Sequence, residues 1–577
     1  MSSDLIQRSI AELGHDSWLT EGGSKIVVKF GAGGQKVTLS HTFPDELLCL
    51  PKFDLVSGHG LGKLAHVLTD GNSDGGRVCI GDDSSTAVNT DRPELAYQDA
   101  VREHVLLLTR LIEDPAYNRE EQLREFEDHW QILCGKKTEE LKELFVVWDG
   151  DRAESLQVRH PHRHPNSGMD LQKRPIALVG RSANDPRLLS VRLGADWGTR
   201  PVKGKAVAVR LIDLEPAPAT QGDLLPWYFG AVRRADSTSR SELRRLHKKK
   251  SGEYWLVFSA PIPDGETLFA IHWYTRSRGA LPASETEVEA GRWTATPYRV
   301  RSLSRGSLVP RGGGSLALTS KSVLLVGCGS VGSELAMQLI SAGVGHLTIS
   351  DPETLSEENL YRHALSVKDI GQLKTVALAG ELALKHPWIE VKPLNNQLEQ
   401  LRDPAVLQTF DLLVIAIGSS TVERVFAEYC RQERISVPVM NCWLEGYGIG
   451  GHAILTVPET KGCWHCAYVD PKTLTRGLVS NLNFLAPDQV VMRNHGGCGT
   501  QFLPYSGIAV GYSASIAADL AVRFLEGQVT NSSKVSWKGS DEEAKRASLA
   551  VTRRYRHFAD SLRILPLHDD NCDLCGG

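Results

Sequence analysis

The stretch Val323-Leu-Leu-Val-Gly327-Cys-Gly329-Ser-Val-Gly332 decides the fold of the C-terminal part of this chain of 577 residues. An apolar strand at residues 323–326 leads into three glycines, and residues 334–341 continue with the pattern of a helix. The bare backbone N–H groups of such a loop, with the N-terminus of the helix behind it, receive phosphate groups. Strands and helices alternate from residue 322 onward, which predicts a doubly wound, Rossmann-like α/β domain.

Polar residues downstream of the loop decide between two kinds of nucleotide. A second apolar strand at residues 346–350 ends in Asp351, where an acid would bind ribose hydroxyls. On these residues alone, an oxidoreductase that uses NAD(P) or FAD is the natural interpretation. Asn359, Arg362 and Lys374 follow, and they suit a triphosphate and the charge that develops at its α-phosphate. A dehydrogenase has no obvious need for them, so the sequence favours ATP.

Together these motifs resemble the activating-enzyme superfamily, which includes ubiquitin-activating enzymes and the bacterial ThiF and MoeB adenylyltransferases. The resemblance covers about residues 316–577 and extends through segments 342–353, 358–362 and 371–374. It implies that ATP and Mg²⁺ bind here, that Asp351 holds the ribose, that Arg362 and Lys374 assist catalysis, and that the domain forms a homodimer. The implied nucleotide ligands are Gly327, Gly329, Gly332, Asp351, Asn359, Arg362 and Lys374.

One position departs from the pattern of this superfamily. Its members usually have an acidic residue after the next apolar strand, where it helps to bind magnesium. Here that strand, at residues 411–417, leads into Gly418-Ser419-Ser420. Either Glu423 or another acid takes over this role, or magnesium binding is rearranged.

The cysteines predict a metal site rather than a disulfide framework. The chain has 11 of them, an odd number, which suits a reducing cytoplasm. Two Cys-x-x-Cys pairs have the spacing that tetrahedral zinc prefers, and four thiolates would close its coordination shell. The predicted ligands of a structural Zn²⁺ are Cys463, Cys466, Cys572 and Cys575. The alternative is two unrelated pairs of buried or redox-active thiols.

A further cysteine, Cys498, lies in the segment Asn494-His-Gly-Gly-Cys498-Gly-Thr. Glycines around a cysteine expose it, and the nearby Arg493 and His495 would favour its thiolate. The resemblance implies that this cysteine captures the adenylated carboxyl group as a thioester. The alternative is a structural cysteine.

Residues 1–145 have the pattern of a compact α+β domain, and one segment in it carries a chemical signal. Asn72-Ser-Asp-Gly-Gly-Arg-Val-Cys79-Ile-Gly resembles the active-site segment of ubiquitin-conjugating enzymes, although the His-Pro-Asn motif of that family is absent. The resemblance implies that Cys79 is a second thiol acceptor. Asn72 could stabilise the oxyanion of transfer, and His66 could act as an acid or base. The alternative for Cys79 is a small core residue on a strand.

The remaining regions of the sequence place weaker constraints on the function. Residues 146–305 are rich in short apolar runs and predict a β-rich middle domain, followed by a flexible linker at residues 302–315. The basic run at residues 244–250 is expected to be a solvated face. A formal charge of −4 argues against a general binder of nucleic acid or membrane surfaces. No apolar run reaches the length of a transmembrane helix, about 18 residues, so we expect a cytoplasmic protein.

The combination of these regions resembles the bacterial fused conjugating–activating enzymes of CBASS anti-phage systems. The resemblance implies that a protein C-terminus is adenylated with ATP, captured on Cys498, passed to Cys79 and joined to an amine of a target protein. The implied substrate is the C-terminus of a cGAS-like nucleotidyltransferase. Conjugation of a bacterial ubiquitin-like protein from a different operon, and a sulfur-carrier adenylyltransferase, remain alternatives. An oxidoreductase and a non-enzymatic scaffold fit the polar residues less well.

Overall fold

The computed structural model describes residues 3–20, 22–58, 60–69, 75–81, 87–135, 142–148, 152–159, 176–180, 205–386, 388–494 and 501–576. The chain divides into two compact units, of which the first ends at Ser304 and the second begins at Arg305. Three structural regions are recognisable within these units: an N-terminal sheet with helices, a β-barrel and a C-terminal α/β domain.

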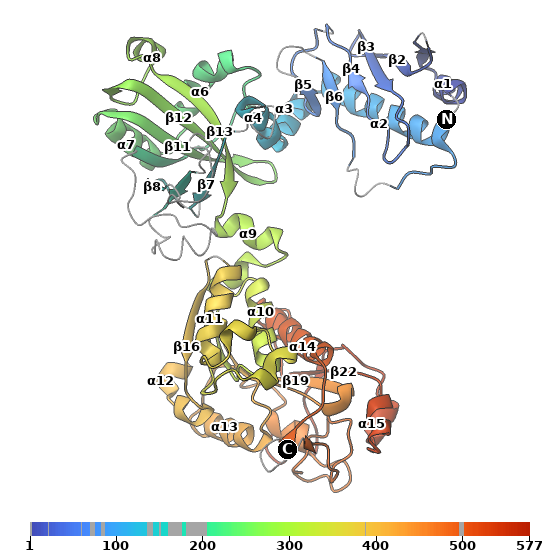
Figure 1. Cartoon of the computed structure of the whole chain (residues 1–577), viewed down its shortest axis with the longest axis vertical. Coiled ribbons are helices and arrows are strands. Elements are labelled where there is room, and N and C mark those ends of the chain that lie inside the picture. Colours follow the sequence, from blue (N-terminus) through green and yellow to red (C-terminus); the bar gives the residue numbers. More distant parts are fainter. Residues whose placement is uncertain are drawn as a thin grey trace. The chain divides into compact units, whose positions relative to one another are not determined.

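The N-terminal region is an antiparallel sheet covered by helices (Figure 1). Strands β2 (Lys25–Ala32) and β3 (Gln35–Thr42) pair along their full length, and every second side chain faces the core, including Ile26 and Val28. The long helix α2 (Pro93–Glu113) packs on this face together with α1 (Ser3–Ala11). The other strands are β1 (Asp16–Leu19), β4 (Asp54–Leu55), β5 (Val67–Thr69) and β6 (Gly76–Val78).

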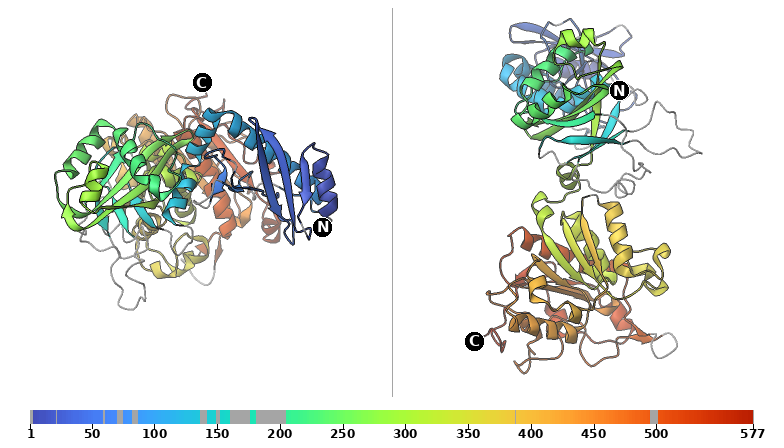
Figure 2. Two further views of the ribbon diagram at one scale, coloured as in Figure 1. Left: turned by 90° about the horizontal axis from the view of Figure 1, so that it is seen from above. Right: turned by 90° about the vertical axis from the view of Figure 1, so that its left-hand side faces the viewer.

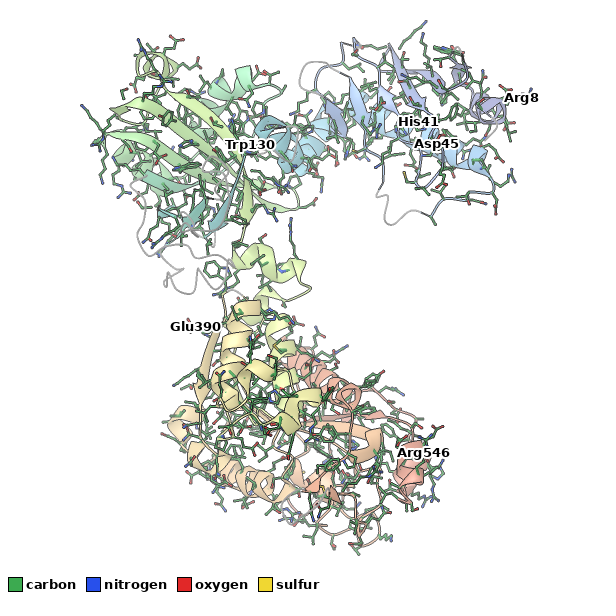
Figure 3. The ribbon with its side chains drawn as sticks, in the orientation of Figure 1. Arg8, His41, Asp45, Trp130, Glu390 and Arg546 are labelled. Atoms are coloured by element: carbon green, nitrogen blue, oxygen red, sulfur yellow. The ribbon has the colours of Figure 1, made fainter. Side chains whose placement is uncertain are left out.

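The charged helical stretch that the sequence predicted at residues 119–133 is two helices, α3 (Pro115–Arg124) and α4 (Phe126–Cys134). Helix α4 belongs to the core of the barrel, because Phe126 and Trp130 pack among the barrel's buried aromatic residues. Trp130 lies where α4 meets the barrel (Figure 3), and its indole N–H donates to the carbonyl oxygen of Tyr298 at 3.0 Å.

The middle region is a closed barrel with strand order β10-β11-β12-β13-β7-β9-β8. The boundary expected between residues 145 and 146 falls inside β7, which pairs in parallel with β13 and therefore belongs to the barrel. Among the described residues of this region, three helices that the sequence did not predict accompany the strands: α6 (Leu224–Arg233), α7 (Ser237–Leu246) and α8 (Glu285–Ala290). The strands are β7 (Glu143–Val147), β8 (Ser155–Arg159), β9 (Ala177–Val179), β10 (Lys205–Arg210), β11 (Ser251–Ile262), β12 (Gly265–Gly279) and β13 (Thr294–Ser302).

The flexible linker expected at residues 302–315 is wrong in part. Residues Arg305–Arg311 form helix α9, with Pro310 in its last turn, and Gly312 closes it by donating to the carbonyl oxygen of Leu308 at 3.1 Å. The Ser/Gly/Arg-rich composition of this segment hid a short helix that opens the second unit.

The C-terminal unit confirms the doubly wound α/β fold (Figures 1 and 2). Its sheet has the order β16-β15-β14-β17-β18-β19-β22-β23, and the pairs from β16 to β18 are parallel. Residues alternate between the two faces of β14: Val323 and Leu325 join the core with helices α10, α11 and α14, whereas Leu324 and Val326 pack with α13. Both faces of β14 are therefore buried, as its continuous apolar sequence requires.

The elements of this unit that carry the site are β14 (Ser322–Val326), α10 (Ser330–Ser341), β15 (His346–Ser350), α11 (Lys374–Lys385), β17 (Leu412–Ile415), α13 (Ser420–Gln432), β18 (Val439–Leu444) and α14 (Gly507–Leu525). The others are β16 (Glu390–Leu394), α12 (Pro404–Leu407), β19 (Gly450–Thr456), β20 (Arg493–Asn494), β21 (Gln501–Phe502), β22 (Ser533–Lys538), α15 (Glu542–Arg546), α16 (Arg553–His557) and β23 (Leu565–Pro566). Among the described helices, α14 alone is long and apolar enough to cross a membrane, and more than half of it is buried in the core of this unit.

Candidate functional site

The three positions of the loop are glycine for different structural reasons. Gly327 has φ +94°, and Gly332 lies so close to the loop that a Cβ atom on it would meet the carbonyl oxygen of Gly327 at 1.8 Å. These two glycines shape the turn and let α10 pack against it. Gly329 precedes the first residue of α10, and a Cβ atom on it would meet nothing within 4 Å. The free space above Gly329 is therefore available to a ligand at the N-terminus of a helix.

Asp351 anchors this loop from the end of β15. Its carboxylate accepts a hydrogen bond from the Cys328 backbone N–H at 2.7 Å and another from the Glu353 N–H at 2.8 Å. The side chain is 93% buried, being only 7% exposed. Asp351 thus fixes the glycine loop and does not itself line the adjoining cavity.

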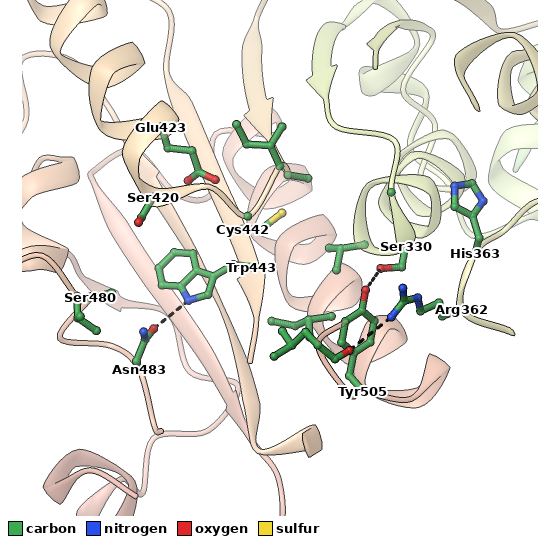
Figure 4. A pocket seen from close by; sticks show the side chains of 18 of the residues that line it. Ser330, Arg362, His363, Ser420, Glu423, Cys442, Trp443, Ser480, Asn483 and Tyr505 are labelled. Atoms are coloured by element: carbon green, nitrogen blue, oxygen red, sulfur yellow. Dashed lines mark hydrogen bonds between the residues drawn. The ribbon is translucent and has the colours of Figure 1, made fainter. Parts of the chain in front are cut away.

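A cavity of about 550 Å³ opens beside the loop (Figure 4). Of the residues predicted to bind the nucleotide, Gly329, Asn359 and Arg362 line it. The Arg362 guanidinium lies over the ring of Tyr505, 4.8 Å from its centroid, and the Tyr505 hydroxyl pairs with the Ser330 hydroxyl at 2.9 Å. Arg362 forms no ion pair with a described residue, so its charge faces the cavity uncompensated and suits an anion.

Lys374 lies beside the loop but not on the wall of the cavity. Its side chain is 5% exposed, and its ammonium group bonds the Glu353 carboxylate at 2.5 Å. The neighbouring His363 does line the cavity, and its Nε2 bonds the carbonyl oxygen of Cys328 at 2.7 Å. Burial lowers the pKa of His363, so the ring is neutral at physiological pH and donates this bond.

The opposite wall of the cavity carries a buried acid. Glu423, in the first turn of α13, is 3% exposed, and its Oε2 accepts a bond from the Asn441 amide at 3.0 Å. Burial raises the pKa of Glu423 to about 8, against the effect of the Asn441 hydrogen bond. Cys442, next to Asn441, also lines the cavity, but burial raises the pKa of its thiol far above the usual range. Cys442 is therefore no candidate for a nucleophile.

The two Cys-x-x-Cys pairs meet in space, as the sequence predicted. The sulfur atoms of Cys463 and Cys572 are 3.7 Å apart, those of Cys466 and Cys575 are 3.3 Å apart, and all four lie within 4.8 Å of one another. Four sulfurs around one zinc at about 2.3 Å stand about 3.8 Å apart in a tetrahedron. The donor set and its spacing therefore fit Zn²⁺, which would join the C-terminal tail to the segment after β19.

Cys79 directly follows β6 in the N-terminal region and contacts the backbone of His66. The Cys79 N–H donates to the carbonyl oxygen of His66 at 2.8 Å. The His66 ring lies between two carboxylates, with Nδ1 2.6 Å from Glu125 and Nε2 3.0 Å from Glu121. Burial lowers the pKa of His66, but the hydrogen bonds and charges of the two glutamates outweigh it and raise the pKa overall.

The thiol of Cys79 is half-buried, and two effects favour its protonated form. Burial raises the pKa of Cys79, and the negative charge of Glu125 raises it further. Cys79 in this state is a thiol rather than a thiolate, and it needs a base to become a nucleophile.

Two predicted site residues, Cys498 and Asn72, lie outside the described residues. The described residues that flank Cys498 in sequence, Asn494 and Gln501, are paired between β20 and β21. Cavity residues that the sequence analysis missed are Ser330, His363, Trp443 and Tyr505. A signal existed for His363, which directly follows Arg362, whereas Tyr505 and Trp443 reach the cavity only through the folding of distant segments.

Comparison with known proteins agrees with this geometry. Residues 306–573 match the ThiF family model. The chain is 23% identical over 423 residues to an ATP-dependent ubiquitin transferase-like protein Cap2 of Pseudomonas aeruginosa, and the match covers 69% of this chain and 73% of that protein. For the Cap2 of Escherichia coli, identity is 24%, with 53% of this chain and 54% of that protein covered. The Escherichia coli molybdopterin-synthase adenylyltransferase is 29% identical over 26% of this chain and 61% of its own length.

Among solved structures, Escherichia coli MccB with AMPCPP and MccA matches 45% of this chain and 68% of its own, at 18% identity and a TM-score of 0.32.

The C-terminal unit is therefore a ThiF-family domain of the adenylyltransferase type. The matches to the Cap2 proteins confirm the resemblance to ThiF-type, CBASS-associated enzymes that the motifs of this chain indicated.

Proposed function

We propose that this chain activates the C-terminal carboxylate of a protein with ATP and transfers it, through two thioesters, to an amine of a target protein. The observation that carries the proposal is the cavity beside the glycine loop, where Arg362 and the N-terminus of α10 face the same space. Such a site suits a polyphosphate and the charge that develops when its α-phosphate is attacked.

The proposed reaction has four steps. A carboxylate oxygen attacks the α-phosphorus of ATP, so a C–O–P bond forms, the bond to the β-phosphate breaks, and pyrophosphate departs, leaving an acyl-adenylate. The thiolate of Cys498 attacks the acyl carbon, so a C–S bond forms and AMP leaves. A base removes the proton of the Cys79 thiol, and the thiolate attacks this thioester, so a C–S bond forms to Cys79 and the C–S bond to Cys498 breaks, which releases the Cys498 thiolate. Attack by an amine finally forms an amide and releases the Cys79 thiol.

Three assignments belong to this proposal. The N-terminal domain, predicted at residues 1–145 and ending before β7 in the structure, acts as a ubiquitin-conjugating-like domain, supported by the order of helix, antiparallel strands and long helix around Cys79. The middle domain, predicted at residues 146–305, includes β7. Residues 316–577 act as the adenylation domain, in which Asn359 and Arg362 face the nucleotide while Asp351 and Lys374 act from beside the glycine loop. The domain pairs as a homodimer in the cytoplasm, where thiols stay reduced.

The proposed substrate is the C-terminus of a cGAS-like nucleotidyltransferase, so that conjugation primes this partner for anti-phage defence. The names of the Cap2 relatives support a transferase of the ubiquitin type. A sulfur-carrier adenylyltransferase is the second candidate, favoured by the match to the molybdopterin-synthase adenylyltransferase. That function would need no thiol at position 79.

Incubation with ATP, Mg²⁺ and proteins from neighbouring genes tests the proposal. We expect the wild type to form an adduct that a reducing agent cleaves, followed by a stable conjugate. Cys498→Ala should block both products, whereas Cys79→Ala should keep the first thioester and lose the conjugate. Full conjugation by either variant would remove that cysteine from the mechanism.

A further inference from the structure

The wall of the nucleotide cavity has an open position after strand β17. Gly418 stands there with φ +67°, and a Cβ atom built on it would meet nothing within 4 Å. Strands β17 and β18 are parallel neighbours, and their carboxyl ends form the edge of the sheet at which ligands of such folds bind. A side chain at position 418 would reach this space, but glycine supplies none.

A carboxylate from the following helix reaches the same wall. Among the described residues that line the cavity, Glu423 is the only acid. Its backbone N–H donates to the carbonyl oxygen of Ser419 at 3.0 Å, which places it one helical turn beyond the open position. Figure 4 shows its carboxylate on the wall that Ser420 and Cys442 also form.

The amide of Asn441 and the backbone at Ser419 and Gly418 favour the ionised form of Glu423. Asn441 holds Oε2 at 3.0 Å, whereas Oε1 is buried and has no hydrogen-bond partner among the described residues. A buried carboxylate oxygen without a partner is unfavourable unless a proton, a donor or a cation satisfies it. Without a bound cation, the raised pKa of Glu423 means that a proton does so at neutral pH, and a bound cation would displace that proton. Asn441 also fixes the orientation of the carboxylate, as hydrogen bonds to metal ligands commonly do.

We propose that Glu423 supplies the protein carboxylate for the divalent cation that accompanies ATP, in place of the acid absent at Gly418. The inference rests on the proposed ATP-dependent function. Mg²⁺ prefers oxygen ligands and is usually held by one or two carboxylates together with phosphate oxygens and water. The residues present fit that requirement, with Glu423 as the ligand and Asn441 as its positioning residue.

The test compares the affinity of the full chain for ATP in Mg²⁺ and in EDTA by calorimetry. The wild type should bind ATP more tightly in Mg²⁺ than in EDTA. Glu423→Gln keeps the size of the side chain and its bond to Asn441, so its affinity in EDTA should match the wild type. The factor by which Mg²⁺ raises the affinity of this variant for ATP should fall about tenfold or more. Glu428→Gln, on the same helix but away from this cavity, should behave as the wild type.

A second, independent test places an acidic residue at position 418. Gly418→Asp places a carboxylate in the open space, and aspartate tolerates a positive φ better than most residues. The double variant Gly418→Asp/Glu423→Gln should recover the Mg²⁺-dependent gain. If Glu423→Gln does not fold, Gly418→Asp alone should bind ATP more tightly in Mg²⁺ than the wild type.

The proposal would be overturned if Mg²⁺ raised the ATP affinity of Glu423→Gln as much as that of the wild type. If only Gly418→Asp folds, the proposal would be overturned by an ATP affinity in Mg²⁺ equal to that of the wild type. Loss of ATP affinity in EDTA as well would also overturn it, since Glu423 would then have only a structural role. Failure of the wild type to bind ATP in both buffers would instead refute the proposed function itself.

Discussion

At the scale of single residues, two glycines of the nucleotide loop have different roles: Gly332 allows close packing, and Gly329 leaves room for the ligand. Gly332→Ala would place a methyl group 1.8 Å from the carbonyl oxygen of Gly327. We expect a loss of about 1–3 kcal/mol in the free energy of unfolding, as is typical of an overpacked position.

Gly329→Ala is the matched control, since its methyl group meets open space. This variant should unfold like the wild type in a thermal melt but bind ATP more weakly, because the methyl group stands where the phosphate approaches. Equal stability of the two variants would contradict the packing of α10 on the loop.

His66 gives a prediction about pH. Its folded-state pKa is raised by Glu125 and Glu121, so the protonated ring contributes stability that is complete below the unfolded pKa, about 6.5. That contribution is lost as the pH rises through the higher folded pKa. The difference in melting temperature between the wild type and His66→Gln should therefore shrink from pH 6 to pH 9. A difference that grows with pH would contradict a raised pKa of His66 in the folded protein.

The residue types in the sequence predicted the chemistry of this site, but they did not predict which side chains reach the cavity. Asn359 and Arg362 line the cavity, whereas Lys374 bonds Glu353 and Asp351 holds the backbone of the loop. Sequence spacing places these residues near the loop, but the direction of a side chain depends on neighbours such as Glu353 and Cys328. Tyr505 could not have been found, because it comes from a segment about 170 residues beyond Ser330, whose hydroxyl lies 2.9 Å from its own.

At the scale of elements, the cysteine cluster stabilises the C-terminal tail. Cys572 and Cys575 lie in a segment without long helices or strands, so a bound Zn²⁺ would supply much of the order there. We expect one zinc per chain by elemental analysis. Cys572→Ser should lose the metal, lower the melting temperature by several degrees and expose the tail to protease.

Cys430→Ser is the matched control for the zinc site, since this buried cysteine lies outside the cluster. Its zinc content should equal that of the wild type. Full zinc content in Cys572→Ser would show that the four thiols are not a metal site.

Elements with strong local patterns were predictable, and elements defined by distant pairing were not. The sequence located β14, α10 and β15 closely, because an apolar run, a glycine loop and a helix follow one another without a break. It missed α6 and α7, and it took α9 for a linker. Closure of the barrel depends on the pairing of β7 with β13, about 150 residues later in the chain, which no local pattern reveals.

At the scale of the whole molecule, one chain holds an activating domain and a second region with its own thiol. We propose that this linkage serves transfer, because a tether raises the effective concentration of Cys79 near the first thioester. The adenylation domain lies wholly in the second unit and Cys79 in the first. Loss of the Cys79 thiol should therefore leave carboxyl activation unchanged.

Exchange of labelled pyrophosphate into ATP measures carboxyl activation most directly. The assay uses the full chain with the candidate protein substrate, either with its natural C-terminal carboxylate or with that carboxylate amidated. We predict exchange with the carboxylate form in the wild type and in Cys79→Ala, and loss of about a hundredfold in Arg362→Ala. Exchange that is equally fast with the amidated protein, or unaffected in Arg362→Ala, would contradict activation of a C-terminal carboxylate in this cavity.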